Sequence, residues 1–217
     1  YRRLVERLGT ADAANGAFRS VIDGWFFALE QDVLAEGGVD ADDDSALLAR
    51  TDALMEARLA AISKAAPAFS AVLRAYRQAV ARGDGSLADG LISWLAGQPN
   101  VAASVKRAAG IKGDLDHFGA ANFLAGLLVI LRDSGYAGLV LVLDEVETLQ
   151  RMRADTRERG LNALRQWIDE IDAGRYPGLY LLVTGTPAFY DGPQGIQRLV
   201  PLAQRLHVDF ATEARFD

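Results

Sequence analysis

Apolar residues recur every three or four positions over most of the first 135 residues, which is the spacing of a helix face. Glycines fall where these stretches end, as they commonly do at helix C-termini. The pattern predicts helices over residues 1–8, 17–35, 45–64, 68–81, from Ser86 to Gly97, and 116–134. Residues 1–135 are therefore expected to form an all-helical region or insertion.

The pattern changes after Gly135, where two continuous apolar runs of strand length appear, over residues 139–143 and 178–184. Apolarity without alternation is typical of strands that are buried on both faces, as in the middle of a parallel sheet covered by helices. We therefore expect these two strands to pair in parallel, with helices on both faces of the sheet.

A helix is predicted between the two strands, with Asp155 as its cap and Gly174 at its end. A further helix is predicted over residues 196–205, followed by a weaker third strand over residues 206–210. Strands that alternate with helices indicate an α/β fold. Residues 136–217 are thus expected to form an α/β core with about three parallel strands.

Composition narrows the class of protein. The chain has 217 residues, 50% of them hydrophobic, which suffices for one substantial domain or two small ones. A net charge of -6 argues against a general electrostatic grip on nucleic acid, so nucleic acid stays open as a partner without support from charge. The absence of cysteine excludes disulfides and thiolate sites and is compatible with a reducing cytoplasm. The longest apolar run, 123–131, is too short for a bilayer, so we expect a cytoplasmic protein without a membrane partner.

Two acids, Asp144 and Glu145, directly follow the first predicted strand. Ligands of parallel α/β sheets bind outside the carboxyl ends of the strands, where these acids would lie. A buried aliphatic run followed by Asp-Glu is the Walker B pattern of P-loop ATPases, in which the first acid orders magnesium and the second polarises the attacking water. The alternative is that both acids simply leave the strand and begin a turn.

Two hydroxyls and one arginine extend this pattern along the chain. Thr184 and Thr186 stand at the end of the second strand, where a sensor residue would touch the γ-phosphate or the attacking water; either could instead cap the next turn. Arg205 closes a predicted helix, where an arginine finger could neutralise charge on a transferring phosphoryl group. An arginine at a helix C-terminus is also favourable for the helix dipole alone.

This order of elements resembles the second half of an AAA-type P-loop ATPase core. More closely, LVLVLDEVETLQRMR, LNALRQWIDEIDAG, GLYLLVTGTPAFYDGPQGIQRL and PLAQRLHVDF are similar to segments of the ATP-binding proteins associated with bacterial BREX phage-defence systems, as are YRRLVERL and GWFFALEQDV. The resemblance implies ATP and Mg²⁺ as cofactors, with Asp144 binding the magnesium nucleotide and Glu145 as catalytic carboxylate. It implies Thr184 or Thr186 as sensor and Arg205 as finger. The implied partners are other subunits of a defence complex, or further copies in a homo-oligomer.

The chain departs from that family pattern in one respect. It contains no G-x-x-x-x-G-K-[ST] sequence, whose backbone amides and lysine hold nucleotide phosphates, and Gly110 to Gly113 lacks the required spacing. We therefore expect a fragment that begins after the Walker A segment, inactive by itself, of a parent that hydrolyses ATP. Loss of the phosphate-binding strand should leave an edge of the sheet open, to be covered by rearrangement or by another chain.

A second hypothesis belongs to a different functional class. The helical region could be a protein-interaction module that rests on a degenerate, non-catalytic α/β core, in which Asp144 and Glu145 have only structural roles. The two histidines, His117 and His207, lack the spacing of a metal site.

Overall fold

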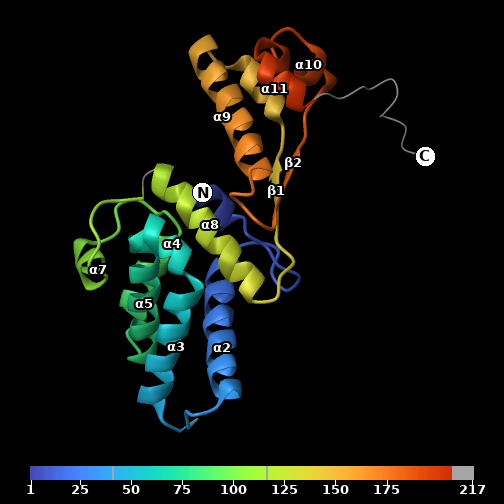
Figure 1. Ribbon diagram of the computed structural model, residues 1–217. Coiled ribbons are helices and arrows are strands. Elements are labelled where there is room, and N and C mark those ends of the chain that lie inside the picture. The colour runs from blue at the N-terminus through green and yellow to red at the C-terminus, as the bar shows by residue number, and fades with distance from the viewer. Residues whose placement is uncertain (41, 116, 207–217) are drawn as a thin grey trace. The chain divides into compact units, whose positions relative to one another are not determined.

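The computed structural model describes residues 1–40, 42–115 and 117–206. Contacts divide the chain into two compact units, one from Tyr1 to Ala137 and one from Gly138 onward. Figure 1 shows helices in the first unit and a small sheet with helices in the second. No helix in the described part of the chain has the length and apolarity needed to cross a membrane.

In the described residues of the first unit, all regular structure is helical, as the sequence pattern predicts. Its helices are α1 (Arg2–Glu6), α2 (Phe18–Glu36), α3 (Asp44–Arg58), α4 (Ala60–Ala65), α5 (Pro67–Ala81), α6 (Gly85–Leu95), α7 (Ala103–Ala108) and α8 (His117–Asp133).

Aromatic side chains fill the core of this unit. The ring of Phe123 on α8 meets Phe69 on α5 edge-on, with ring centres 4.9 Å apart, and Trp94 on α6 at 5.6 Å. A Cβ atom at Gly126 would lie 2.5 Å from a ring carbon of Phe69, so only glycine permits this close approach of α8 to α5. Aromatic edge-to-face packing thus joins three helices that are distant in sequence.

Two details of the helical prediction are wrong. The single helix expected over residues 45–64 is divided at the fully buried Leu59, whose φ of -96° and ψ of 10° depart from helical values. Helix α6 begins before Ser86, because the carboxylate of Asp84 accepts a hydrogen bond from the amide of Leu87 at 3.0 Å. A carboxylate at this position also interacts favourably with the helix dipole, so Asp84 is the N-cap of α6.

One buried cation joins α5 to α2 and α3. The side chain of Arg77 is only 6% exposed. Its guanidinium donates hydrogen bonds to the carbonyl of Leu48 at 2.9 Å and to the carboxylates of Asp52 at 3.0 Å and Glu30 at 2.9 Å. A buried charge requires such partners, so this network fixes how the three helices pack.

The second unit contains a two-stranded sheet. Strands β1 (Leu139–Leu143) and β2 (Leu179–Val183) pair in parallel with Leu139 opposite Leu179 and Leu143 opposite Val183, which confirms the predicted parallel pairing. Its helices are η1 (Val146–Arg151) and α9 (Ala154–Asp172) between the strands, then α10 (Pro187–Asp191), η2 (Ile196–Arg198) and α11 (Val200–Arg205). The third predicted strand, 206–210, lies almost wholly outside the described residues and stays a prediction.

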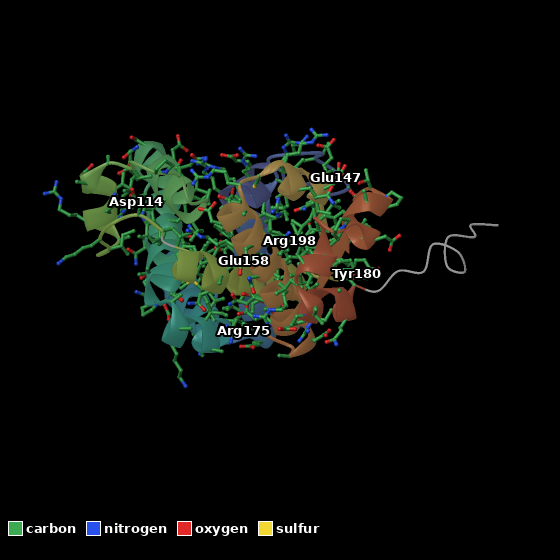
Figure 2. All side chains as sticks on the ribbon, turned by 90° about the horizontal axis from the view of Figure 1, so that it is seen from above. Asp114, Glu147, Glu158, Arg175, Tyr180 and Arg198 are labelled. Carbon is green, nitrogen blue, oxygen red and sulfur yellow. The ribbon has the colours of Figure 1, made fainter. Side chains whose placement is uncertain are left out.

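Only one face of this sheet is covered within its own unit. Leu143, Leu181 and Val183 pack against a core that α9, α10, η2 and α11 supply. The opposite face carries exposed apolar side chains at 43–66% exposure, which are Val140, Val142, Tyr180 and Leu182, and Figure 2 labels Tyr180. The prediction that both faces of the sheet are buried is therefore wrong for the described residues. Successive side chains of a strand point to opposite faces, and the described helices of this unit cover only one of them.

Replacement of Arg77 by alanine is expected to lower the free energy of unfolding by about 2 kcal/mol or more, because two carboxylates and a carbonyl lose their shared donor. Urea denaturation of the purified protein measures this loss. The matched control is Arg74→Ala on the same helix, whose exposed ion pair with Glu56 should contribute less than about 1 kcal/mol. Equal losses in the two variants would contradict the structural importance of the buried network.

Candidate functional site

The two strand ends remain joined beyond the last residues of the strands. The amide of Thr184 donates to the carbonyl of Leu143 at 3.0 Å, and the amide of Val146 donates to the carbonyl of Thr184 at 3.1 Å. Parallel pairing in register brings the carboxyl ends of both strands to the same edge of the sheet. The residues that follow β1 and β2 therefore lie beside one another.

Asp144 and Thr184 meet at this edge. The Oδ1 atom of Asp144 accepts a hydrogen bond from the hydroxyl of Thr184 and another from the amide of Glu145 at 2.9 Å. Asp144 is exposed and Thr184 is half-buried, so the pair borders solvent. A carboxylate held by two donors while still open to solvent has a fixed direction and free lone pairs for a ligand.

Glu145 has an unusual backbone conformation. Its φ of 55° and ψ of 44° lie in the left-handed region, which is uncommon for residues other than glycine. Such a conformation carries a strain of about 1–3 kcal/mol and is found preferentially at functional sites. Glu145 is exposed, and no described residue donates a hydrogen bond to its carboxylate. Its carboxylate is thus left accessible beside Asp144.

Thr186, the other predicted sensor, is held through its backbone. It lies at the start of α10 with extended backbone angles, and its hydroxyl makes no capping hydrogen bond. Its amide instead donates to the Oε2 atom of Glu147 at 3.3 Å. Of the two threonines, only Thr184 places its hydroxyl on Asp144.

Glu147 is a site residue that the sequence patterns do not single out. It lies on η1 and is half-buried. Burial of the Tyr190 phenol raises the pKa of that group, and the negative charge of Glu147 raises it further. The sequence carries a signal for it, since it is the third acid in LVLVLDEVE, but no rule of spacing separates its role from that of Glu145. The turn into η1 decides which acid faces the second strand end.

Arg205 is anchored away from this group of residues. Its Nε atom pairs with Asp169 on α9, and its Nη1 atom donates to the carbonyl of Pro201 at 2.6 Å. Asp169 also pairs with Arg165 at 2.9 Å. The described contacts therefore bring Asp144, Glu145, Thr184 and Thr186 together and place Arg205 in an ion pair between α9 and α11.

The donor set fits a hard divalent cation that is shared with a ligand. Among the described residues, no three His, Asp or Glu side chains converge to form a metal site by themselves. Mg²⁺ is commonly held by one or two carboxylates together with water and substrate phosphates. Asp144, with the oxygen of Thr184 beside it, can supply such a carboxylate.

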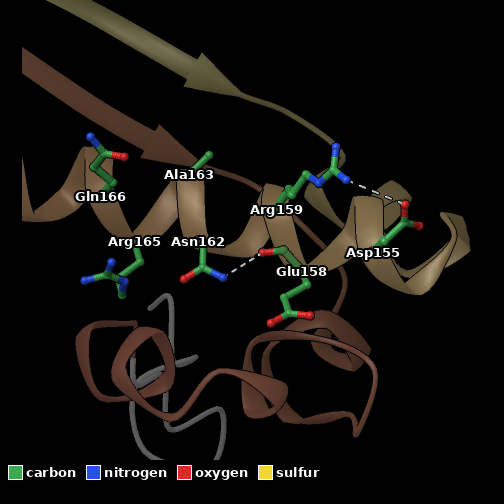
Figure 3. A pocket seen from close by; sticks show the side chains of 7 residues that line it. All are labelled: Asp155, Glu158, Arg159, Asn162, Ala163, Arg165 and Gln166. Carbon is green, nitrogen blue, oxygen red and sulfur yellow. Dashed lines mark hydrogen bonds and ion pairs between the residues drawn. The ribbon is translucent and has the colours of Figure 1, made fainter.

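A shallow hollow of about 500 Å³, lined mostly by polar residues, runs along α9 (Figure 3), and none of the predicted site residues lines it. Asp155 is ion-paired with Arg159 at 3.9 Å, one turn further along the helix.

The structure also corrects the capping role predicted for Asp155, because α9 starts after Arg153 and Asp155 lies in its first turn. Its charge there still interacts favourably with the helix dipole.

Comparison with known protein families supplies the identity of the chain. A family model described as BREX system ATP-binding protein BrxC/D matches residues 1–217. The chain belongs to this family. No curated protein and no solved structure matches the chain. Family membership confirms the resemblance seen in the sequence and identifies an ATP-binding component of the BREX phage-defence system.

Replacement of Gly185 by alanine is expected to disturb the joined strand ends. The added Cβ atom would lie 2.8 Å from Cγ2 of Val146, a contact that costs about 1–3 kcal/mol when neighbours must shift. Hydrogen exchange at the amides of Val146 and Thr184 should become faster. Gly24→Ala on α2, where a Cβ atom meets nothing within 4 Å, is the control and should leave both rates unchanged.

Proposed function

We propose that Asp144, Glu145 and Thr184 form the Walker B side of an ATP-hydrolysing site of the AAA type. The observation that carries this proposal is the hydrogen bond from the Thr184 hydroxyl to the Asp144 carboxylate at the shared edge of two parallel strands. Family membership supports it, because the family is one of ATP-binding proteins. An acid and a hydroxyl at this edge match the two strand-end positions that face nucleotide in such folds.

Each residue has a distinct part in this proposal. Asp144 orients the water shell of magnesium, whose charge would neutralise phosphate oxygens. Glu145, with its accessible carboxylate, accepts a proton from the attacking water. Thr184 holds Asp144 by donating its hydroxyl proton to the carboxylate, and it would sense a terminal phosphate by turning that proton toward a phosphate oxygen. The backbone amide of Thr186 donates to Glu147 and thereby ties down the loop that follows Thr184.

Arg205 is proposed as the arginine finger toward a neighbouring subunit of the defence complex or of a homo-oligomer. Its guanidinium is engaged by Asp169 and by the carbonyl of Pro201, so this role requires release from that pairing. Both side chains of the ion pair are about one-third exposed, at 34% and 32%, so solvent weakens the pairing.

The second candidate function is a protein-interaction module. It is favoured by the exposed apolar face of the sheet, formed by Val140, Val142, Tyr180 and Leu182. Apolar patches of this kind often mark contact surfaces. In that case Asp144 and Glu145 would have structural roles only.

Glu145→Gln is expected to lower ATP turnover by the intact protein by about 100-fold or more, because an amide cannot take up the proton of the attacking water. Nucleotide affinity should be retained. Phosphate release and ATP binding are measured side by side. Glu158→Gln, an exposed acid on α9, is the control and should behave as the wild type. Unchanged turnover in Glu145→Gln would reject the assigned base and favour the interaction module.

Residues 1–217 contain no G-x-x-x-x-G-K-[ST] sequence to hold phosphates. We therefore predict that a polypeptide of these residues alone binds magnesium ATP weakly and does not hydrolyse it. Isothermal titration calorimetry is the measurement, and tight binding would show that another segment of the chain supplies the phosphate grip.

A further inference from the structure

Glu147 links η1 to the loop that follows β2. Its Oε2 atom accepts a hydrogen bond from the amide of Thr186 at 3.3 Å, across 39 positions of sequence. Figure 2 labels Glu147 among the side chains of the molecule. Asp144 makes a second side-chain link between the two strand ends, through its hydrogen bond with the Thr184 hydroxyl. These two carboxylates therefore hold opposite ends of the segment Thr184-Gly185-Thr186.

The backbone alone does not hold this segment to its end. The last backbone bonds between the two chain segments are those of Thr184 with Leu143 and Val146. Beyond Thr184, the bond from Thr186 to Glu147 continues the pairing by one further step. Without this hydrogen bond, Gly185 and Thr186 would have no hydrogen bond to η1 among the described contacts.

We propose that Glu147 is a positioning residue for the proposed ATPase site: it fixes the Thr184-Gly185-Thr186 segment so that the Thr184 hydroxyl stays on Asp144. This inference rests on the proposed function for its effect on turnover. Glu147 touches neither of the reacting groups assigned above and acts through the loop. It also stands apart from Glu145, which follows Asp144 directly and has an accessible carboxylate.

The surroundings of Glu147 suit a fixed acceptor. A Cβ atom at Gly185 would lie 3.3 Å from its Oε2 atom, so glycine lets the loop approach the carboxylate. Burial raises the pKa of the Tyr190 phenol on α10, and the negative charge of Glu147 raises this pKa further. The Tyr190 hydroxyl donates to the carbonyl of Val183 at 3.1 Å. The carboxylate of Glu147 thus holds the residue that begins α10 and lies close to Gly185 of the loop.

Two variants separate positioning from chemistry. Glu147→Gln keeps an oxygen that accepts the Thr186 hydrogen bond, whereas Glu147→Ala removes the acceptor. In the intact protein, Glu147→Ala should lower kcat for ATP by about tenfold or more with KM nearly unchanged, because a misplaced group loses rate steeply. Glu147→Gln should stay within about threefold of the wild type, since the hydrogen bond persists. Glu158→Ala is the control and should match the wild type.

Hydrogen exchange at the Thr186 amide supplies a readout that does not depend on turnover. Exchange should be slow in the wild type and in Glu147→Gln, and faster in Glu147→Ala. Similar exchange in all three proteins, or a kcat unchanged by Glu147→Ala, would overturn the positioning role. A Glu147→Gln variant as slow in turnover as Glu147→Ala would also overturn it, because a reacting carboxylate would then be indicated.

Turnover of Glu145→Gln tests the ATPase assignment, and exchange at the Thr186 amide tests the positioning role of Glu147 separately. If Glu145→Gln leaves turnover intact, the proposed ATPase assignment is rejected. The Thr186 exchange rates then decide alone whether Glu147 holds the loop. If Glu145→Gln abolishes turnover while Glu147→Ala does not affect it, the ATPase assignment stands and the positioning role is wrong.

Discussion

In-register parallel pairing of β1 with β2 is the constraint on which the candidate site depends. Parallel strands end at the same edge, so the first polar residue after each strand meets the other. Asp144 and Thr184 are 40 positions apart in sequence, yet they share a hydrogen bond because Leu143 and Val183 are register partners. A slip of one residue would turn alternate side chains to the other face and separate this pair.

The helices that follow each strand keep that register. Leu161 and Leu164 of α9 and Phe189 of α10 form a buried cluster against one face of the sheet. A two-stranded sheet has little stability by itself, so this single helical layer supplies most of the apolar burial of the unit. Among the described residues, the opposite face of the sheet stays apolar and exposed.

Strain and anchoring are distributed unevenly around the strand ends. Glu145 adopts a left-handed conformation immediately after Asp144, whose carboxylate accepts two hydrogen bonds, while the carboxylate of Glu147 accepts one from the opposite loop. The accessible carboxylate of Glu145 thus stands between two anchored ones in the sequence. Arg205 lies outside this arrangement, in an ion pair with Asp169.

Much of the fold could be predicted from the sequence, because helix and strand periodicities are local. The helical first unit, the strands at residues 139–143 and 178–184, and the acids at the end of β1 were all recognisable in this way, and the family followed from the same segments. Only the tertiary structure decided that Thr184 rather than Thr186 places its hydroxyl on Asp144, and that Glu147 accepts a hydrogen bond from Thr186. It also decided that one face of the sheet is exposed among the described residues. Each of these depends on the direction of a side chain across a contact between distant segments, which no local period encodes.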